Sequence, residues 1–297
     1  MLWPITLCLA VQTYREKYQK TQKGKIGLTI DSGFSLPWDA TNPDDIKAVD
    51  ISFAFSYGWL GDPVVFGKYP QEMSDFITGN RLPSFTAEQS KLLKGSFDFL
   101  GVNYYASSYV QYTGTVGNDY GSDGRFDSSP YNKSGNLIGP FAASTWLNVY
   151  PPGLRGLLNW VAKRYDNPEL IIFENGVSCP GENDMPEAQA LNDTFRMDYI
   201  YNHIMNMVDA IVNDKVKVKG YFLWLLLDNF EWTDGYHIRF GITYVDYNNN
   251  LTRTIKNSGY LYQSLIGYLG THHVEEAKKI SMNEFEERGK YLNQLIE

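Results

Sequence analysis

The chain has 297 residues, 43% of them hydrophobic and 15% aromatic, which is enough apolar material to fill the core of a single α/β barrel. Its formal net charge is −8 and no basic cluster offsets that charge, so nucleic acids and anionic membranes are unsuitable partners. The two cysteines, Cys8 and Cys179, form neither a metal-binding pattern nor a disulfide framework.

The first ten residues, MLWPITLCLA, form an apolar run without a positively charged beginning. The run is too short to span a bilayer, so we expect no transmembrane segment. It is either the core of an incomplete signal peptide, or the beginning of a helix or an arbitrary start of the chain, and the missing positive charge favours the second interpretation. Three glycosylation sequons, at Asn132, Asn192 and Asn250, matter only if the protein is exported.

Four short apolar runs predict strands, and helical patterns separate them. The runs lie at residues 24–30, 97–105, 169–176 and within 218–230. Their apolar residues fall on both faces, which is typical of parallel strands covered by helices. Strands that alternate with helices predict parallel βα units.

Caps and apolar spacing predict the helices between these strands. Pro43, followed by two aspartates, marks the beginning of one helix, and Thr86 with Gln89 forms a capping box for another that Gly95 closes. A third helix follows Pro152, and we expect Asp193 to cap a fourth. Their apolar faces are Leu154, Leu157, Leu158 and Val161, and then Met197, Ile200, Tyr201, Ile204, Val208 and Ile211.

The remaining segments complete the expected organisation. Residues 114–139 are rich in Gly, Ser, Asp and Asn and predict a long loop. Spaced apolar residues among charges predict one surface helix after residue 273. We therefore divide the chain into an apolar segment at 1–10, a barrel part at 11–273 and a helical tail at 274–297.

Polar and aromatic residues gather where the four predicted strands end. They are Asp31 and Ser32; Asn103, Tyr104 and Tyr105; Glu174 and Asn175; and Trp224, Asp228, Asn229, Glu231 and Trp232. In parallel α/β folds, chemistry collects at the carboxyl ends of the strands. A carboxylate beside indole rings suits a sugar, because aromatic faces pack on the C–H faces of a pyranose while acids and amides bind its hydroxyls.

At these residues the sequence resembles the family 1 glycoside hydrolases, which include β-glucosidases, lactase-like proteins and myrosinases. The matching stretches are YREKYQKTQKGKIGLTIDS, FDFLGVNYY, WLNVYPPGLRGLLNW, IIFENG and GYFLWLLLDNFEWTDGYHIRFGITYVDY, and they cover residues 11 to about 270 in the family's order. The resemblance implies an α/β fold of the (β/α)8 TIM-barrel type. Because the chain begins where the family has the helix after its fourth strand, we expect only strands five to eight, a partial barrel.

The resemblance also implies a role for each matching residue. Glu174 matches the catalytic nucleophile, which bonds to the anomeric carbon, and Tyr105 matches the tyrosine that orients it. The substrate-binding residues by resemblance are Asn103, Trp146, Trp224, Glu231, Trp232 and Phe240.

These binding residues have distinct expected positions. By resemblance, the Trp224 indole floors the site for the non-reducing sugar, and Glu231 with Trp232 binds its outer hydroxyls. Asn103 lies near the nucleophile, Trp146 forms the aromatic wall of the aglycone site, and Phe240 is an aromatic of the sugar pocket. Position alone would also fit simpler readings, in which Glu174 is a buried acid paired with an arginine and the tryptophans are core residues.

The sequence departs from the family at three places. Phe173 stands where the family usually has Thr, and Leu225 where it usually has Ser. The chain also lacks the Asn-Glu-Pro motif that carries the family's acid/base carboxyl group. A retaining glycosidase needs two carboxyl groups about 5–5.5 Å apart. We therefore expect a truncated β-glycoside hydrolase that is weakly active or inactive alone.

Other interpretations remain open. The chain could instead be a carbohydrate-binding pseudoenzyme, a half-barrel that pairs with another chain or with itself through its open edges, or an incomplete gene product. The resemblance implies no cofactor, and His272 with His273 finds no further metal ligand at a suitable spacing. The family and the sequons favour secretion or the endomembrane system over the cytoplasm.

Overall fold

The computed structural model describes residues 3–271 and 274–294, and these residues form two compact units. The first unit takes its residues from Met1–Gly139, Trp160–Phe173 and Lys217–Tyr221. The second takes them from Pro140–Asn159, Glu174–Val216 and Phe222–Glu297. Helix α8 (Pro151–Arg164) begins in the second unit and ends in the first.

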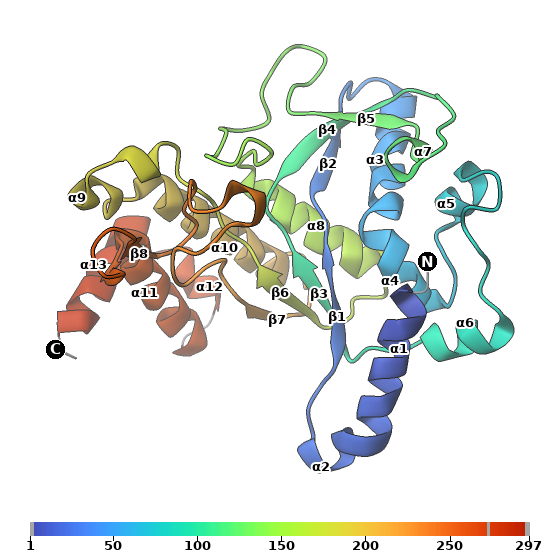
Figure 1. The fold of residues 1–297 in the computed structure, drawn as a ribbon, viewed down its shortest axis with the longest axis horizontal. Helices are drawn as coiled ribbons and strands as arrows, with labels where there is room; N and C mark the ends of the chain where they lie inside the picture. The colour runs from blue at the N-terminus through green and yellow to red at the C-terminus, as the bar shows by residue number, and fades with distance from the viewer. Residues whose placement is uncertain (1–2, 272–273, 295–297) are drawn as a thin grey trace. The chain divides into compact units, whose positions relative to one another are not determined.

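The main sheet contains the four strands that the sequence predicts. They are β1 (Gly27–Asp31), β3 (Phe99–Asn103), β6 (Leu170–Glu174) and β7 (Val218–Tyr221), in the order β1-β3-β6-β7 (Figure 1). β1 pairs parallel with β3, and β6 pairs parallel with β7. The predicted parallel arrangement is therefore confirmed for both pairs.

One face of this sheet is less covered than the sequence predicts. Along β6, Leu170 and Ile172 are fully buried, whereas Ile171 and Phe173 are only partly buried. In β1, Ile30 is buried and its neighbour Thr29 is exposed. Side chains alternate between the two faces of a strand, so the exposed positions share one face. The prediction that helices cover both faces is wrong for this one.

Phe173, one of the departures from the family, packs on this same face. Its ring centroid lies 5.8 Å from that of Phe99, on the neighbouring strand. A Cβ on Gly101 would lie 2.9 Å from Cδ2 of Phe173 and 2.6 Å from Oγ1 of Thr29. The bulky ring at position 173 therefore fits because the residue beside it on β3 is glycine.

The other elements of the first unit include a second sheet. Its strands are β2 (Phe34–Pro37), β4 (Ser107–Tyr112) and β5 (Phe126–Ser129), in the order β2-β4-β5. The helices are α1 (Trp3–Tyr14), the π-helix η1 (Arg15–Gln19), α2 (Lys20–Gln22), α3 (Pro43–Phe55), α4 (Tyr57–Phe66), α5 (Gln71–Phe76), α6 (Ala87–Leu93) and α7 (Tyr120–Asp123).

Several local predictions for the first unit are confirmed, and one is wrong. Residues 3–10 of the apolar run lie in α1, Pro43 begins α3, and Thr86 with Gln89 forms the capping box of α6. The long loop predicted at 114–139 contains α7 and β5 instead. β5 carries the sequence FDSS, which has no apolar alternation, and it forms because its backbone pairs antiparallel with β4.

The second unit is mainly helical. Its elements are the beginning of α8, the 3₁₀ helix η2 (Glu182–Asp184), α9 (Glu187–Ala190), α10 (Thr194–Val212), the 3₁₀ helix η3 (Trp232–Asp234), β8 (Thr243–Asp246), β9 (Thr252–Ile255), α11 (Asn257–Thr271), α12 (Val274–Ala277) and α13 (Met282–Gln294). β8 and β9 form an antiparallel pair. The tail predicted as one helix contains two.

The tail is also less superficial than predicted. Phe285 of α13 is fully buried, and its ring lies 5.5 Å from that of Tyr268 on α11 and 6.5 Å from that of Tyr201 on α10. A Cβ on Gly289 would lie 1.9 Å from the carbonyl oxygen of Tyr260. This close approach of backbones requires glycine, so α13 packs tightly on α11.

A buried carboxylate fixes the end of α8 within the first unit. Asp62 is 4% exposed and accepts two hydrogen bonds from Arg164, at 2.7 and 2.6 Å, and one of 2.8 Å from the hydroxyl of Tyr165. Such a bidentate pair is short and directional. It joins α4, which carries Asp62, to the C-terminal end of α8.

We predict that Asp62→Ala destabilises the protein by about 1–3 kcal/mol, because it removes the buried carboxylate that accepts hydrogen bonds from the Tyr165 hydroxyl and from the partly buried Arg164 guanidinium, whose other carboxylate neighbour, Glu72, lies 3.8 Å away. Urea unfolding followed by circular dichroism measures this change. Asp75→Ala is the control: Asp75 is exposed and accepts only a side-chain hydrogen bond from Gln71, so we expect a change within about 0.5 kcal/mol. Equal unfolding midpoints for the two variants would contradict the assignment.

Candidate active site

The segment after β6 is held against the loop that carries Trp224. Glu174 ends β6 and is partly buried. Asn175 is fully buried, its amide donates to the hydroxyl of Tyr199 at 2.9 Å, and its carbonyl oxygen accepts from the Trp224 backbone at 3.0 Å. A Cβ on Gly176 would lie 1.7 Å from the Trp224 carbonyl oxygen. Glycine is therefore needed here for close approach of two backbones.

The Trp224 indole and the Glu231 carboxylate form a pair beside Glu174. Nε1 of Trp224 donates to Oε2 of Glu231 at 3.4 Å. Burial raises the pKa of Glu231, the Trp224 bond opposes that change, and the negative charges of Asp234 and Glu174 raise the pKa further. The structure thus brings Glu231 within hydrogen-bond reach of Trp224 and within electrostatic reach of Glu174.

Asp228 fixes the loop that runs from Trp224 to Glu231. Its side chain accepts from the backbone amides of Gly241, at 3.0 Å, and Val245, at 3.2 Å. It also accepts from Arg239 at 2.6 Å and from Lys256 at 2.9 Å. Asp228 therefore anchors this loop.

Asp228 belongs to a buried network of six charged side chains in the second unit, which we call the ion network. Its members are Glu182, Asp193, Asp228, Arg196, Arg239 and Lys256, each at most 5% exposed. Arg196 pairs with Glu182 and Asp193, and Lys256 pairs with Glu182 and Asp228. Three anions balance three cations, so charges that are costly to bury singly are all paired.

Asp193 shows how the ion network overrides a local rule. It occupies the position before α10 where the sequence predicts a side-chain cap, but it makes no capping hydrogen bond. Its carboxylate accepts instead from Arg196 and from the backbone and hydroxyl of Ser258. The predicted cap is therefore wrong, because buried donors compete successfully for the same oxygens.

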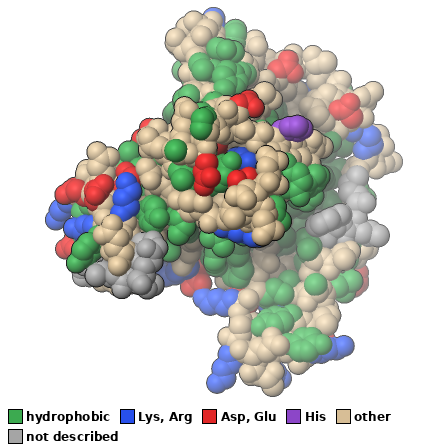
Figure 2. Space-filling model, turned by 60° about the vertical axis from the view of Figure 1, so that its left-hand side comes forward, with side chains coloured by type: hydrophobic (Ala, Val, Ile, Leu, Met, Phe, Trp, Pro, Cys, Tyr) green, Lys and Arg blue, Asp and Glu red, His purple; other side chains and the backbone are tan. Residues whose placement is uncertain are grey.

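The other aromatic candidates of the second unit differ in accessibility. Trp232 and Trp146 are 76% and 57% exposed, so their indoles are open to a ligand. Phe240 is only 1% exposed, and the prediction that its ring lines a sugar pocket does not agree with this burial. Its backbone carbonyl accepts from Leu225 at 3.3 Å, which closes the base of the loop. Figure 2 shows hydrophobic and acidic side chains together on one face of the molecule.

Asn103 and Tyr105 belong to the first unit. Asn103 ends β3, and its buried Oδ1 has no hydrogen-bond partner among the described residues. Tyr104 is fully buried and its hydroxyl lies 2.8 Å from that of Ser107, whereas Tyr105 is partly exposed. Because side chains alternate along an extended chain, only one of these adjacent tyrosines should point inward, and the family motif favours Tyr105, whereas the structure buries Tyr104. The role of Tyr105 beside Glu174 stays a prediction.

Sequence reasoning missed one residue that shapes this site. The negative charge of Asp234 raises the pKa of Glu231. Asp234 lies in the stretch DNFEWTD, whose density of polar groups was the only available signal. The ion network gave none, because its charges are scattered from position 182 to position 256.

The described residues contain neither a metal-binding cluster nor a membrane-spanning helix. In that part of the chain no group of three or more His, Cys, Asp or Glu side chains is arranged to hold a metal ion. His272 and His273 lie outside the described residues. No described helix is long and apolar enough to cross a membrane.

Comparisons with known proteins agree on one family. The family model for glycosyl hydrolase family 1 matches residues 5–271. Beta-glucosidase 12 of Oryza sativa subsp. japonica is 44% identical over 259 residues, which cover 86% of this chain and 50% of that protein. Raucaffricine-O-beta-D-glucosidase of Rauvolfia serpentina is 41% identical over 255 residues, 84% of this chain and 46% of that protein.

Solved structures give the same result. The crystal structure of a GH1 β-glucosidase from the fungus Humicola insolens, in complex with glucose, has a TM-score of 0.86 at 44% identity and covers 89% of this chain and 55% of that one. The crystal structure of the β-glucosidase from Trichoderma harzianum also has a TM-score of 0.86, at 40% identity. It covers 89% of this chain and 56% of that one. The fold is thus α/β of the TIM-barrel type. The chain spans about half the length of the curated relatives that it matches.

We predict that the carboxyl group of Glu231 titrates above its usual pKa of 4.5 and that Glu174→Gln lowers this pKa, because one neighbouring negative charge is removed. Carbon-13 NMR titration of glutamate-labelled protein measures both values. Glu287→Gln, at an exposed position on α13, is the control and should leave the titration unchanged. An unchanged midpoint in Glu174→Gln would contradict the proximity of the two carboxylates.

The same shift has a consequence for stability. Since the pKa of Glu231 is raised in the folded state, this group adds stability below its unfolded pKa, and that contribution is lost as the pH rises through the folded pKa. Between the unfolded and the folded pKa of Glu231, the urea concentration at the unfolding midpoint should therefore depend less on pH in Glu231→Gln than in the wild type.

Proposed function

Because the chain belongs to glycosyl hydrolase family 1, we propose that it carries the nucleophile part of a retaining β-glycoside hydrolase, with Glu174 as the nucleophile. The observation that carries this proposal is the position of Glu174 at the end of β6, within electrostatic reach of Glu231, which accepts a hydrogen bond from the Trp224 indole. A carboxylate at a strand end beside an indole and a second acid suits a sugar ring.

In the proposed reaction, a Glu174 oxygen attacks the anomeric carbon and the bond to the aglycone oxygen breaks. The aglycone leaves with the electron pair, and water later releases the sugar from the glycosyl-enzyme. By family resemblance we assign Tyr105 to orienting Glu174 and Asn103 to binding near it. The Trp224 indole packs on the sugar face and fixes the Glu231 carboxylate, while the exposed indoles of Trp232 and Trp146 bind outer parts of the substrate.

We further propose that the main sheet is the second half of a barrel. Three observations support this: the sheet has four strands in the described residues, one of its faces is only partly covered, and the relatives are about twice as long. The sequence also contains no Asn-Glu-Pro, the motif that supplies the proton to the leaving aglycone in this family. The chain alone would then hydrolyse ordinary β-glycosides slowly, since loss of general acid/base catalysis alone costs about 10²–10⁴-fold in rate.

An activated substrate tests this proposal. A 2,4-dinitrophenyl β-glucoside has a leaving group that needs no proton, so we expect the purified chain to release dinitrophenolate in a burst that Glu174→Gln abolishes. Steady turnover should stay about 10²–10⁴-fold below that of family members with both carboxyl groups. Glu169→Gln, on the exposed pair with Lys25, is the matched control and should keep the burst. A burst that survives Glu174→Gln would rule out this nucleophile, and ordinary turnover of an unactivated β-glucoside would rule out the missing acid.

One observation also favours sugar binding without hydrolysis. The contact between Trp224 and Glu231 needs no acid/base group and is complete within the second unit. Titration with gluconolactone, followed by tryptophan fluorescence, distinguishes this candidate: saturable binding in Glu174→Gln, without any dinitrophenolate burst in the wild type, would favour it.

The open strands β1 and β7 also predict self-association, which the molecular mass in solution measures.

A further inference from the structure

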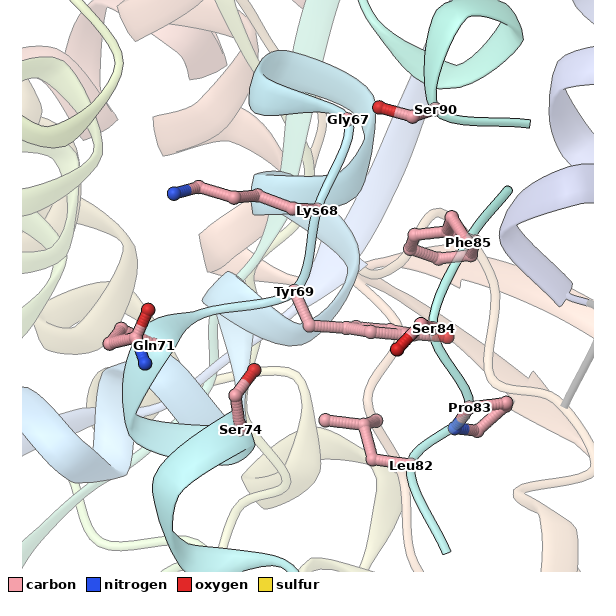
Figure 3. A pocket seen from close by; sticks show the side chains of 10 residues that line it. All are labelled: Gly67, Lys68, Tyr69, Gln71, Ser74, Leu82, Pro83, Ser84, Phe85 and Ser90. Carbon is pink, nitrogen blue, oxygen red and sulfur yellow. The ribbon is translucent and has the colours of Figure 1, made fainter. Parts of the chain in front are cut away.

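The first unit contains a cavity of about 280 Å³ beside the end of α4, the beginning of α5 and helix α6 (Figure 3). Most of the polar side chains that line it are exposed, namely Lys68, Gln71, Ser74 and Ser84. The hydroxyl of Tyr69 is enclosed by protein and closed to the cavity. The lining therefore offers a ligand no enclosed hydrogen-bond partner. Enclosed polar contacts that bear on the proposed function lie instead in the second unit, on the residues that follow Glu174.

Asn175 links the proposed nucleophile to the loop that carries Trp224. It directly follows Glu174 in the chain and is fully buried. Its backbone carbonyl oxygen accepts from the backbone amide of Trp224 at 3.0 Å, and its side-chain amide donates to the hydroxyl of Tyr199 at 2.9 Å. All four residues belong to the second unit. The backbone positions of Glu174 and of Trp224 therefore both depend on where Asn175 lies.

Tyr199 is in turn fixed within α10. It is 1% exposed, and its ring stacks on the imidazole of His203, with centroids 3.7 Å apart and an interplanar angle of 26°. Nδ1 of His203 donates to the carbonyl oxygen of Tyr199 at 2.7 Å. Burial lowers the pKa of His203 to about 3, so the imidazole stays neutral near pH 7. The hydroxyl that accepts from Asn175 is thus held by a rigid, uncharged stack.

The contact between Asn175 and Tyr199 is closed to water. Both side chains are at most 1% exposed, so an Asn175 amide without the Tyr199 hydroxyl would lose its acceptor while buried. A buried donor without a partner is costly, and a shift of the chain around Asn175 relieves that cost. Such a shift would move the adjacent Glu174, and a displacement of about 1 Å at a reacting group is enough to slow a reaction about 100-fold.

We propose that Tyr199 is a positioning residue for the nucleophile: its hydroxyl fixes Asn175, and Asn175 fixes Glu174 relative to the loop that carries Trp224 and Glu231. Because it is buried, Tyr199 acts on a substrate only through these neighbours. The inference rests on the proposed function in one respect, which is that Glu174 is the nucleophile. The dependence of the Glu174–Glu231 separation on Tyr199 requires no reaction, so it is tested separately.

The first measurement is the rate constant of the dinitrophenolate burst in Tyr199→Phe, which keeps the ring and removes one hydrogen bond. We expect the burst to be about 3- to 10-fold slower than in the wild type. In an Asn175→Ala background, Tyr199→Phe should slow the burst no further, because the hydroxyl acts through the Asn175 amide. A further decrease of similar size in that background would contradict the proposed route through Asn175.

Tyr201→Phe is the matched control. Tyr201 lies on the same helix, and its hydroxyl also makes one hydrogen bond of 2.9 Å, to the carbonyl oxygen of Ile280. Both variants should therefore lower the urea midpoint, and circular dichroism verifies that both are folded. Only Tyr199→Phe should slow the burst. Equal burst rate constants in the two variants would show that Tyr199 is merely structural and would overturn the proposal.

The second measurement is independent of activity. Glu174→Gln is expected to lower the pKa of Glu231, since it removes a neighbouring negative charge. Carbon-13 titration should show a smaller decrease in a Tyr199→Phe background, where Glu174 is no longer held in place, and the wild-type decrease in a Tyr201→Phe background. Equal decreases in all backgrounds, or no decrease in any, would overturn the proposal. A wild-type chain without a burst would refute the proposed function alone, and this titration would then decide the role of Tyr199.

Discussion

The second unit depends on the pairing of charges that have been removed from water. Three carboxylates and three cations are each at most 5% exposed in the ion network. A lone buried charge is prohibitively costly, and a pair is tolerated only when the geometry is good and the remaining donors are also satisfied. These conditions are met because Arg196 and Lys256 each join two carboxylates. Removing a member leaves its partners buried with one opposite charge fewer.

The ion network matters for function through the loop that it holds. Asp228 is both a member of the network and the acceptor for the backbone amides of Gly241 and Val245. Trp224 and Glu231 lie on either side of Asp228 along the chain, so a fixed Asp228 limits where their side chains can go. The contact of Gly176 with the Trp224 carbonyl joins the same loop to the residues that follow Glu174. The proposed nucleophile and the proposed sugar-binding pair are thus held by backbone contacts and by buried charge.

In the first unit, the strands of the main sheet are regularly paired, but one face of the sheet is less buried than the other. The partial burial of Ile171 and Phe173, against the complete burial of Ile172 between them, marks one face as incomplete. This pattern is the one expected of the half-barrel that we propose, since the strands opposite cover the inner face of a complete barrel.

The sequence by itself determined the features that depend on neighbours along the chain. The four strands of the main sheet, the capping box at Thr86 and the position of Glu174 at a strand end all follow from local patterns. The family followed from short motifs in the expected order. Each of these needs only the period of a strand, the geometry of a helix end or a contiguous match.

Only the tertiary structure decided which groups meet across long separations. It showed that Asp193 bonds to Ser258 rather than capping α10, that Phe240 is core, and that FDSS is a strand because β4 lies beside it. It also showed that six charges scattered over the sequence are buried together, and that Gly176 is required by the Trp224 carbonyl. These outcomes depend on the competition for hydrogen bonds and space between residues far apart in the chain, and no local pattern encodes that competition.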